Sequence, residues 1–427
     1  MSHYFKYISE KGIANLAHYH YSGVDNSWCG THFLKYWWTY AVEHLTPLWL
    51  AKVNLINLLI LFSFFTLYSP NLITLVGLLC NIGMYLIIYF HCPTLTEEAP
   101  RWCYLAVAFL IFAYQTLDNV DGKQARRTKS SSPLGELFDH VCDAISVAMF
   151  AVVMSATLRV GPKWAFISLF VGIWPFYLAH WEEYHAGILV MGEFNGPTEA
   201  QVLFMIIEII TCIFSSDIWI IGPKDFTIGM MATVAVSFGA IFTIYQNFKN
   251  TFALQNRIPF MKCLIQLTPF VIFNILIIIW VSVSDLLTTQ PHLFIMTIGM
   301  VFAYLQSRYI TQRVCHDDCL LFYPILVPFA IVVFNSILAS FQSNLISEYA
   351  MLWVMFVLAC IQFLIFAVFT TRQLCDHLRI KVFTITSGGG GGGGSAGQPS
   401  ESQQSSLLSA VEEGAIEHED DDNNNNK

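Results

Sequence analysis

The chain has 427 residues, of which 55% are hydrophobic and only 12% are charged. A soluble domain normally carries about 25% charged residues, so this composition excludes an ordinary soluble fold for most of the chain. The net charge of −9 comes mainly from eight acidic residues beyond position 387, which leaves a nearly neutral body and gives no indication of nucleic-acid binding.

The N-terminal segment, 1–51, is polar at first and then aromatic. It lacks the basic stretch followed by an apolar core that marks a cleavable signal. From His32 to Trp49, tryptophan and tyrosine alternate with charged residues such as Lys35 and Glu43, a composition typical of the membrane headgroup layer. We therefore expect a cytosolic segment that contains an interfacial helix lying on the membrane.

Apolar runs about 18 to 23 residues long then recur, and each is long enough to cross a hydrocarbon core of roughly 30 Å as a helix. The expected membrane spans are 70–91, 102–118, 138–158, 163–181, 200–222, 226–246, 262–284, 291–310, 320–342 and 349–370. An earlier run, 53–68, is short and carries Asn54 and Asn57, so an eleventh span or a re-entrant segment stays open there. The predicted fold class is an all-α polytopic membrane protein with about ten transmembrane helices.

The last segment, 388–427, begins with seven consecutive glycines and continues with serine, glutamine, acidic residues and four asparagines. Such a composition buries too little apolar surface to offset the entropy lost on ordering. We predict that this segment is a disordered tail.

The densest basic cluster of the chain lies between positions 121 and 139. It contains Lys123, Arg126, Arg127 and Lys129. Because cytosolic loops of membrane proteins carry an excess of lysine and arginine, this cluster predicts that the loop faces the cytosol.

Acidic side chains gather on both sides of this basic cluster. Asp118 and Asp121 are three residues apart before it, and Asp139 and Asp143 are four apart after it, so each pair lies on one helix face. Carboxylates are costly at the ends of membrane helices, which makes such a cluster a functional hypothesis. Two facing helix ends would present four carboxylates to one point, which suits hard divalent cations such as Mg²⁺ or Mn²⁺.

Neighbouring residues suit a phosphate-bearing ligand. Gly122 and Gly135 leave room for a ligand to approach the backbone. Arg126 offers a planar fork of donors for phosphate oxygens. Together with the aspartates, these residues predict a site of metal-assisted phosphoryl transfer at the cytosolic membrane surface.

The order of these residues resembles the signature of the CDP-alcohol phosphotransferase family. The sequence reads Asp118-x-x-Asp121-Gly122-x-x-Ala125-Arg126 and, after eight residues, Gly135-x-x-x-Asp139-x-x-x-Asp143. Four stretches are similar to the eukaryotic choline and ethanolamine phosphotransferases: YHYSGVDNS (19–27), SPNLITLVG (69–77), DGKQARRTKSSSPLGELFDHVCD (121–143) and FYLAHWEEY (176–184). The similarity covers roughly residues 15–380.

This resemblance implies a ten-helix enzyme that transfers phosphocholine or phosphoethanolamine from CDP-choline or CDP-ethanolamine to diacylglycerol and releases CMP. It implies Mg²⁺ or Mn²⁺ held by the four aspartates, with Asn71 and Arg126 on the nucleotide donor. It favours the endoplasmic reticulum or Golgi membrane with the active site facing the cytosol, and it is compatible with a homodimer.

Two residues compete for the role of general base. In microbial relatives the role of base is often given to the last aspartate, here Asp143. The aminoalcohol branch of the family has a histidine at the position of His140. A carboxylate shared between two cations has a low proton affinity, while a neutral imidazole near pH 7 is well matched to accepting a hydroxyl proton. We therefore prefer His140 as the base and keep Asp143 as the alternative.

The resemblance also divides the chain. A catalytic core at 70–246 precedes additional transmembrane helices at 247–387. Relatives run Trp-Leu-Ala directly into Pro-Asn-Leu-Ile-Thr, but here Ala51 and Pro70 are separated by an atypical apolar insertion, 52–69.

Other functions stay open as alternatives. A different CDP-alcohol or lipid acceptor would use the same residues. A secondary transporter would place its ionisable residues near the midplane within inverted repeats, and an inactive scaffold would have lost an aspartate or Arg126. Trp174, Trp181 and Tyr184 offer aromatic faces to a quaternary ammonium, but such residues more often pack in the membrane, so choline and ethanolamine both remain candidates.

Overall fold

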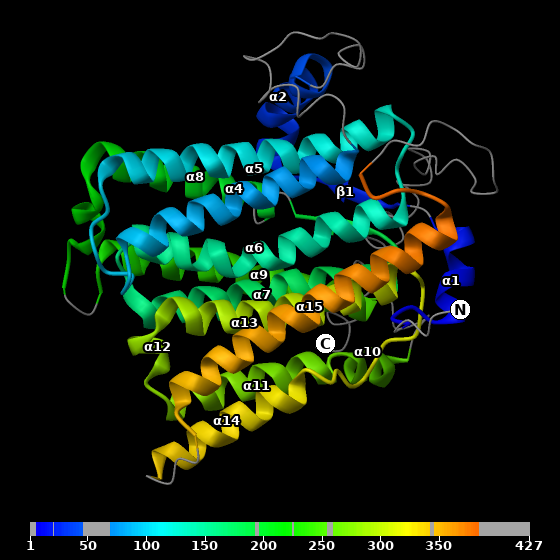
Figure 1. The fold of residues 1–427 in the computed structure, drawn as a ribbon. Coiled ribbons are helices and arrows are strands. Elements are labelled where there is room, and N and C mark those ends of the chain that lie inside the picture. Colours follow the sequence, from blue (N-terminus) through cyan, green and yellow to red (C-terminus); the bar gives the residue numbers. More distant parts are fainter. Residues whose placement is uncertain are drawn as a thin grey trace, which may run out of the picture.

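The computed structural model describes residues 6–19, 21–45, 69–192, 196–223, 226–253, 259–341 and 346–383, and these are almost entirely helical (Figure 1). The long helices are α4 (Pro70–His91), α5 (Arg101–Arg127), α6 (Pro133–Thr157), α7 (Gly161–Ala186), α8 (Pro197–Phe214), α9 (Ile228–Ala253), α13 (Pro291–Val314) and α15 (Glu348–Leu378). The shorter ones are α1 (Glu10–Asn15), η1 (Leu16–His18), η5 (Ser216–Ile220), α10 (Phe260–Gln266), α11 (Thr268–Val283), α12 (Leu286–Thr289) and α14 (Leu326–Ser340).

Within the described ranges, eight helices are long and apolar enough to cross a membrane, or nine if α10 and α11, which meet at a bend of 45°, form one span. The apolar helix α14 is shorter. Each of the ten expected spans overlaps one or more of these helices, but 262–284 covers both α10 and α11, and 320–342 corresponds to the shorter α14. The predicted all-α polytopic membrane fold is confirmed, with eight or nine helices of spanning length among the described residues. The run 53–68 and the tail 388–427 lie outside the described residues.

Helices α5 and α6 extend further toward each other in sequence than hydropathy indicated. The expected span 102–118 continues as helix to Arg127, and the expected span 138–158 already begins at Pro133. Ser132 caps α6 by accepting a hydrogen bond from the Gly135 N–H at 3.2 Å, and Pro133 occupies the first helical position. Hydropathy ends a span at the first polar residues, although those residues still favour helix, so the aspartates lie inside helices rather than at their ends.

Helix α13 is the central helix of the described structure. Almost all its residues are buried, because it packs against α6, α7 and α15. On one side of it, α4 packs against both α5 and α6, while α5 also contacts α8. Figure 1 shows these helices running side by side, so that the end of α5 and the start of α6 lie at the same end of the molecule as the short strand β1 (Gly23–Asp25).

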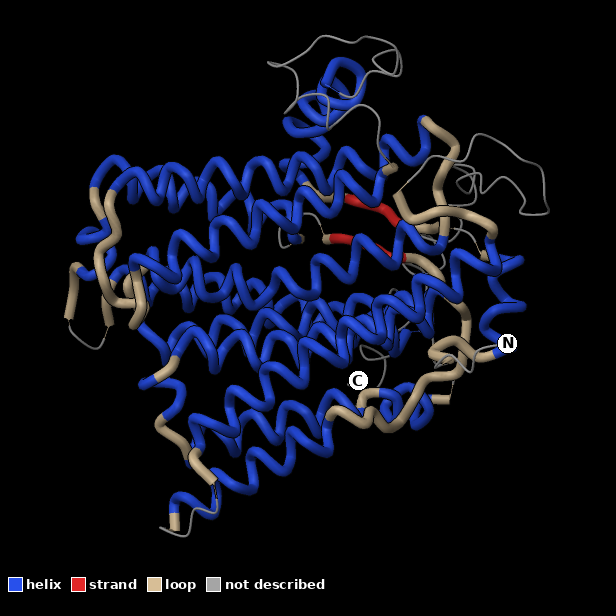
Figure 2. Tube along the Cα trace, in the orientation of Figure 1, coloured by secondary structure: helices blue, strands red, loops and turns tan. Residues whose placement is uncertain are grey.

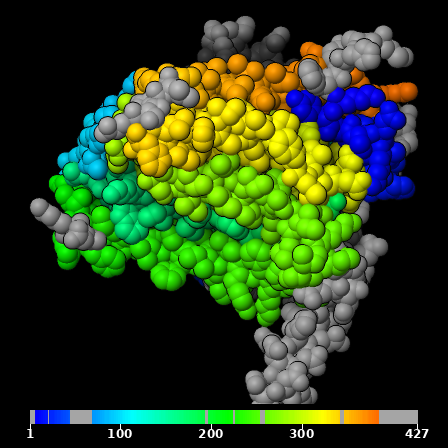
Figure 3. Space-filling model, turned by 90° about the horizontal axis from the view of Figure 1, so that it is seen from below, coloured from blue at the N-terminus to red at the C-terminus, as the bar shows by residue number. Residues whose placement is uncertain are grey.

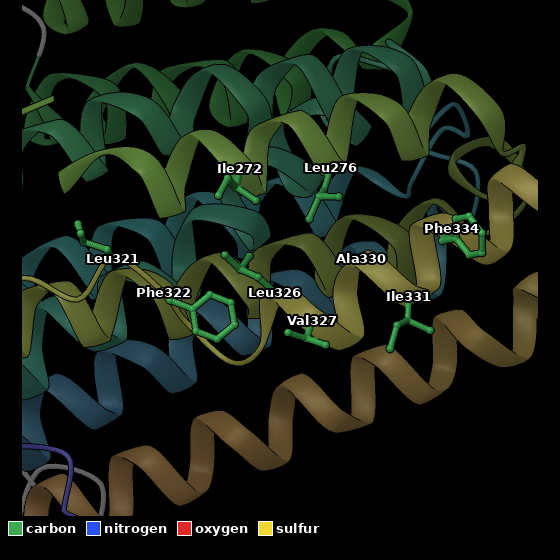
Figure 4. Close-up of a pocket in the computed structure, with 9 residues that line it drawn as sticks. All are labelled: Ile272, Leu276, Leu321, Phe322, Leu326, Val327, Ala330, Ile331 and Phe334. Carbon is green, nitrogen blue, oxygen red and sulfur yellow. The ribbon is translucent and has the colours of Figure 1, made fainter. Parts of the chain in front are cut away.

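The last helices form an apolar outer layer. Helix α14 packs against α11 and α15, and the three lie next to one another on the face seen in Figure 3. A groove of about 450 Å³ between α11 and α14 is lined only by apolar side chains, among them Ile272, Phe322 and Phe334 (Figure 4). None of its lining residues belongs to α4, α5 or α6. A groove of this composition suits the hydrocarbon of a bilayer rather than a charged ligand.

The N-terminal segment is tied to the helical body by a short parallel pairing that the sequence did not reveal. Strand β1 (Gly23–Asp25) pairs with β2 (Leu189–Met191), which follows α7, as the red strands in Figure 2 show. After it comes the expected aromatic helix, made of a π-helical turn η2 (Gly30–Leu34), α2 (Lys35–Tyr40) and a second π-helical turn η3 (Ala41–Leu45).

This aromatic helix docks on the helical body at the same end. The indole N–H of Trp37 donates to the Thr116 hydroxyl of α5 at 3.0 Å, and Ala41 and Val42 are buried against α4 and α5. Tyr36 and Tyr40 stay exposed on the other side. The segment therefore has one face on the protein and one aromatic face, as an interfacial helix requires.

The contact between α13 and α6 predicts a large effect for one small substitution. A Cβ on Gly299 of α13 would overlap the Cβ of Ala148 on α6, so Gly299→Ala must push the two helices apart. We expect a loss of about 1 to 3 kcal/mol in stability, seen as a lower melting temperature of the purified protein in detergent.

Gly239 of α9 is the matched control for this substitution. No atom lies within 4 Å of a Cβ built there, so Gly239→Ala should be neutral or stabilise the helix by up to about 1 kcal/mol. Equal melting temperatures for the two variants would contradict the tight packing of α13 on α6.

Candidate active site

The four aspartates of the signature lie on two helices that are held apart by a third. Asp118 and Asp121 belong to α5, and Asp139 and Asp143 belong to α6. Helix α4 packs against both, whereas the backbones of α5 and α6 make hardly any contact with each other. The carboxylates fill this space, and Asp118 interacts electrostatically with Asp139 and Asp143 across it. The structure thus brings the four predicted aspartates together.

Two hydroxyl groups donate to these carboxylates. The Thr74 hydroxyl of α4 donates to Asp121 Oδ2, and the Tyr114 hydroxyl of α5 donates to Asp143 Oδ1. Asp139 Oδ1 is buried and has no hydrogen-bond partner among the described residues. A buried acceptor without a donor is destabilising unless something else binds it, so the site has an unmet demand for positive charge.

A metal ion would meet that demand. In the described part of the chain, one group of three metal-ligating side chains has its ligand atoms within 4.8 Å of one another: Asp139, His140 and Asp143. Carboxylate oxygens suit Mg²⁺ and Mn²⁺, so the donor set fits the divalent cation expected from the sequence. The group differs from the expected ligand set, because it includes His140 and lies on α6 alone.

The residues expected on the nucleotide donor lie around this cluster. Arg126 is exposed one turn beyond Gly122, and a Cβ built on Gly122 would meet only the Arg126 guanidinium, at 3.5 Å. A Cβ on Gly135 would lie 3.5 Å from Asn71 Oδ1, which places the start of α4 beside the start of α6. Gly122 therefore stands beside a flexible side chain that can move for a ligand, whereas the space beside Gly135 is filled by Asn71 and Ser132.

Asn71 has a contact that the sequence did not indicate. Its side-chain amide donates to the carbonyl oxygen of Val382 at 2.9 Å, and the Ser69 hydroxyl donates to the same oxygen at 3.0 Å. The segment after α15 thus reaches back to the start of α4. The amide of Asn71 is engaged within the protein rather than directed freely toward the aspartates.

His140 lies one residue beyond Asp139 and is buried, and its Nε2 atom has no hydrogen-bond partner among the residues that the structure describes. The ring of His180 from α7 meets the ring of His140 edge-on, with centroids 4.8 Å apart. His180 Nδ1 lies 2.9 Å from the Phe176 carbonyl, which accepts only, so Nδ1 carries the proton. The base candidate therefore sits between the carboxylates and a second, oriented histidine.

Two tyrosines of the N-terminal segment approach the site from outside the membrane helices. The Tyr19 hydroxyl donates to Glu136 of α6. Burial, followed by the neighbouring Glu136, raises the pKa of Tyr19 well above its ordinary value, and burial with Glu136 and Asp139 also raises the pKa of Tyr21. Both phenols therefore stay neutral next to carboxylates, and the Tyr19 hydroxyl serves as a donor to one of them.

Several of these partners were not singled out from the sequence. Tyr19, Thr74, His180 and Glu183 all lie in the stretches that resemble the choline and ethanolamine phosphotransferases, so a signal for them was present. Tyr114 precedes the first aspartate by four residues, one helical turn. Arg313 of α13 pairs with Glu136 and lies in no quoted motif, so no local pattern identified it.

Sequence similarity to known proteins points to the same family as the aspartate signature. The family model described as CDP-alcohol phosphatidyltransferase matches residues 67–304, which is more than half of the chain. An uncharacterized CDP-alcohol phosphatidyltransferase class-I family protein 2 of Dictyostelium discoideum is 72% identical over 385 residues, covering 90% of this chain and 89% of that protein.

Relatives with named activities are more distant. Choline/ethanolaminephosphotransferase 1 of Arabidopsis thaliana is 34% identical over 73% of this chain and 79% of its own length. Cholinephosphotransferase 1 of Homo sapiens is 31% identical over 82% of this chain and 83% of its own. The similarity extends well beyond the short aspartate signature.

The hydrogen bond that the Tyr114 hydroxyl donates to Asp143 should stabilise the carboxylate cluster measurably. Tyr114→Phe removes only the hydroxyl that donates to Asp143 and leaves that buried carboxylate less compensated. Since hydrogen bonds to charged groups contribute about 1.5 to 3 kcal/mol, we expect a clearly lower melting temperature when metal is removed with EDTA.

Tyr177→Phe is the control, because the buried Tyr177 hydroxyl has no hydrogen-bond partner in the described ranges. Removing an unpaired buried hydroxyl should leave stability unchanged or improve it. If both phenylalanine variants melt alike, the bond from Tyr114 to Asp143 has no energetic importance.

Proposed function

This chain belongs to the CDP-alcohol phosphatidyltransferase family, and we propose that it transfers phosphocholine or phosphoethanolamine from CDP-choline or CDP-ethanolamine to diacylglycerol. Membership of this family makes the chain a phosphotransferase, and its long apolar helices make it a membrane protein. The family implies a CDP-alcohol donor and a lipid acceptor. The choice of aminoalcohol and of diacylglycerol is the proposal, supported by the named activities of the relatives.

One observation carries the proposal: four carboxylates converge between α5 and α6, and a buried imidazole lies beside them. Few hydrogen-bond donors from the described residues reach these carboxylates. An inactive scaffold has no need for such a cluster, and none of the four aspartates of the signature is replaced. A reaction that brings a pyrophosphate and a divalent cation to the membrane surface does need it.

We assign Asp118, Asp121, Asp139 and Asp143 to binding Mg²⁺ or Mn²⁺, which when bound neutralises charge on the pyrophosphate of the donor. Arg126 of α5 adds a guanidinium that is suited to binding the phosphate oxygens. Gly122 leaves the backbone beside Arg126 open to a ligand, and Gly135 lies next to Asn71 at the start of α4.

His140 is assigned to accept the hydroxyl proton of diacylglycerol. The acceptor oxygen then forms a bond to the β-phosphorus of the donor, the bond from that phosphorus to the oxygen of CMP breaks, and CMP leaves with the electron pair. The His180 ring meets the His140 ring edge-on, and no residue in the described part of the chain hydrogen-bonds to His140 Nε2. Asp143 is the alternative base.

The basic residues at the end of α5 support a site that faces the cytosol. Arg126, Arg127 and Lys129 are exposed there, beside the aspartates. We propose the endoplasmic reticulum or Golgi as the membrane, with homodimer formation compatible with the fold.

A transfer assay tests the proposal directly. Purified protein in lipid nanodiscs, given diacylglycerol, labelled CDP-choline or CDP-ethanolamine and Mg²⁺ or Mn²⁺, should form labelled phospholipid and CMP. Asp121→Asn should abolish turnover, because it removes one charge from the metal site while the hydroxyl of Thr74 can still donate to the amide oxygen. Turnover that survives EDTA or this substitution would contradict the metal assignment.

The general base is tested by a second pair of variants. His140→Ala keeps all four aspartates, so binding of CDP-alcohol should persist while kcat falls by about 10² to 10⁴. Asp143→Asn should instead weaken metal binding, so part of its activity should return at high Mg²⁺ or Mn²⁺.

The opposite pattern would exchange the two roles. If His140→Ala turns over normally and Asp143→Asn stays inactive at every metal concentration, Asp143 is the base. Partial rescue of His140→Ala by added metal would make His140 a ligand, as its place in the Asp139, His140 and Asp143 group also permits.

A further inference from the structure

A buried ion cluster joins three helices beside the active site. The Arg313 guanidinium at the end of α13 pairs with Glu136 of α6 through Nη1 and with Glu183 of α7 through Nε, the latter at 3.2 Å. The side chains of all three residues are at most 9% exposed. The second carboxylate oxygen of Glu136 accepts from Tyr19, so the N-terminal segment joins the same cluster.

The cluster acts on the part of α6 that carries the metal-site residues. Glu136 precedes His140 by four residues and Asp143 by seven, and both spacings return to the same face of a helix. A constraint on Glu136 therefore limits the rotation of α6 and with it the directions of these side chains. Ser132 caps α6 at its start but does not fix that rotation.

The other arm of Arg313 reaches the helix that carries the neighbouring histidine. Glu183 follows His180 by three residues on α7, about one turn away. The His180 ring meets the His140 ring, so Arg313 reaches both of the helices whose histidines are in contact. A planar guanidinium can pair with two carboxylates at once, whereas the ammonium of lysine is a single point charge.

We propose that Arg313, which lies beyond the segment 67–304 matched by the family model, is a positioning residue that sets the orientation of α6 and α7 at the metal site. This inference rests on the proposed function for the identity of that site. Arg313 itself pairs with Glu136 and Glu183 and acts through them.

Arg313→Lys is the informative variant, because it keeps the charge and loses the fork. Mn²⁺ binding to the purified protein, without substrate, is followed by the electron paramagnetic resonance of free Mn²⁺. Since partners that orient metal ligands typically contribute 10- to 100-fold in affinity, we expect Arg313→Lys to raise the Kd for Mn²⁺ by at least about tenfold. Its KM for CDP-alcohol should change less than its kcat.

Arg308→Lys is the matched control on the same helix. The Arg308 guanidinium lies over the rings of Tyr7 and Phe366, at 4.7 and 5.7 Å from their centroids, and has no ion pair to α6 among those the structure shows for the described residues. Lysine retains a cation over those rings, so the Mn²⁺ affinity should stay within about twofold of the wild type. Equal effects of the two lysine variants, or no effect of either, would overturn the proposal.

A second comparison applies if Arg313→Lys does not fold. Glu136→Gln weakens the arm on α6 and should raise the Kd for Mn²⁺, whereas Glu183→Gln weakens only the arm on α7 and should change it less. Equal shifts would reject the role of α6 orientation. A wild type that binds Mn²⁺ but uses neither CDP-choline nor CDP-ethanolamine as a donor would refute the proposed function and leave this inference standing. A wild type that does not bind Mn²⁺ would refute both.

Discussion

Two aspartates of α5 face two aspartates of α6 within the helical body, and carboxylates this close repel one another unless donors or cations compensate them. Among the described residues, hydroxyl groups donate to Asp121 and Asp143, and none donates to Asp139 Oδ1. Helix α4 packs against both helices and keeps them apart. The helices are thus arranged around a charge that the protein does not compensate by itself, which is why a divalent cation fits the site.

Residues far from the signature complete its surroundings. The N-terminal segment reaches α6 through Tyr19 and pairs as β1 with β2 after α7. Helix α13 shares one buried apolar core with α4, α6 and α7, and that core extends as far as Phe366 of α15. The division into a catalytic core at 70–246 and additional helices at 247–387 stays a prediction. In space, α13 packs directly against α6, which carries two of the four aspartates.

The membrane spans and the aspartates were predictable because each leaves a strong local pattern: apolar length for the spans, and helical spacing of rare charges for Asp118 to Asp143. The ends of α5 and α6 were not, because polar residues such as Lys123 and Gln124 lower hydropathy while they still favour helix. The three-residue strands β1 and β2 are too short for a periodic signal. Arg313 was missed because its partners are 130 or more positions away, and pairing over that distance is a property of the packed helices alone.

The contact of Asn71 with Val382 links the donor side of the site to the segment after α15. Asn71 and Ser69 donate to the same carbonyl oxygen, which has two lone pairs and can satisfy both. If Asn71 turns its amide to the nucleotide, as proposed, Ser69 can still hold that carbonyl, so the segment need not leave. The ring of Phe383 also meets Phe138 of α6 edge-on, with centroids 6.1 Å apart. If the donor nucleotide binds Asn71, the Val382 carbonyl loses one of its two hydrogen bonds and keeps the one from Ser69. Losing one hydrogen bond costs less than releasing the whole segment from α4 and α6.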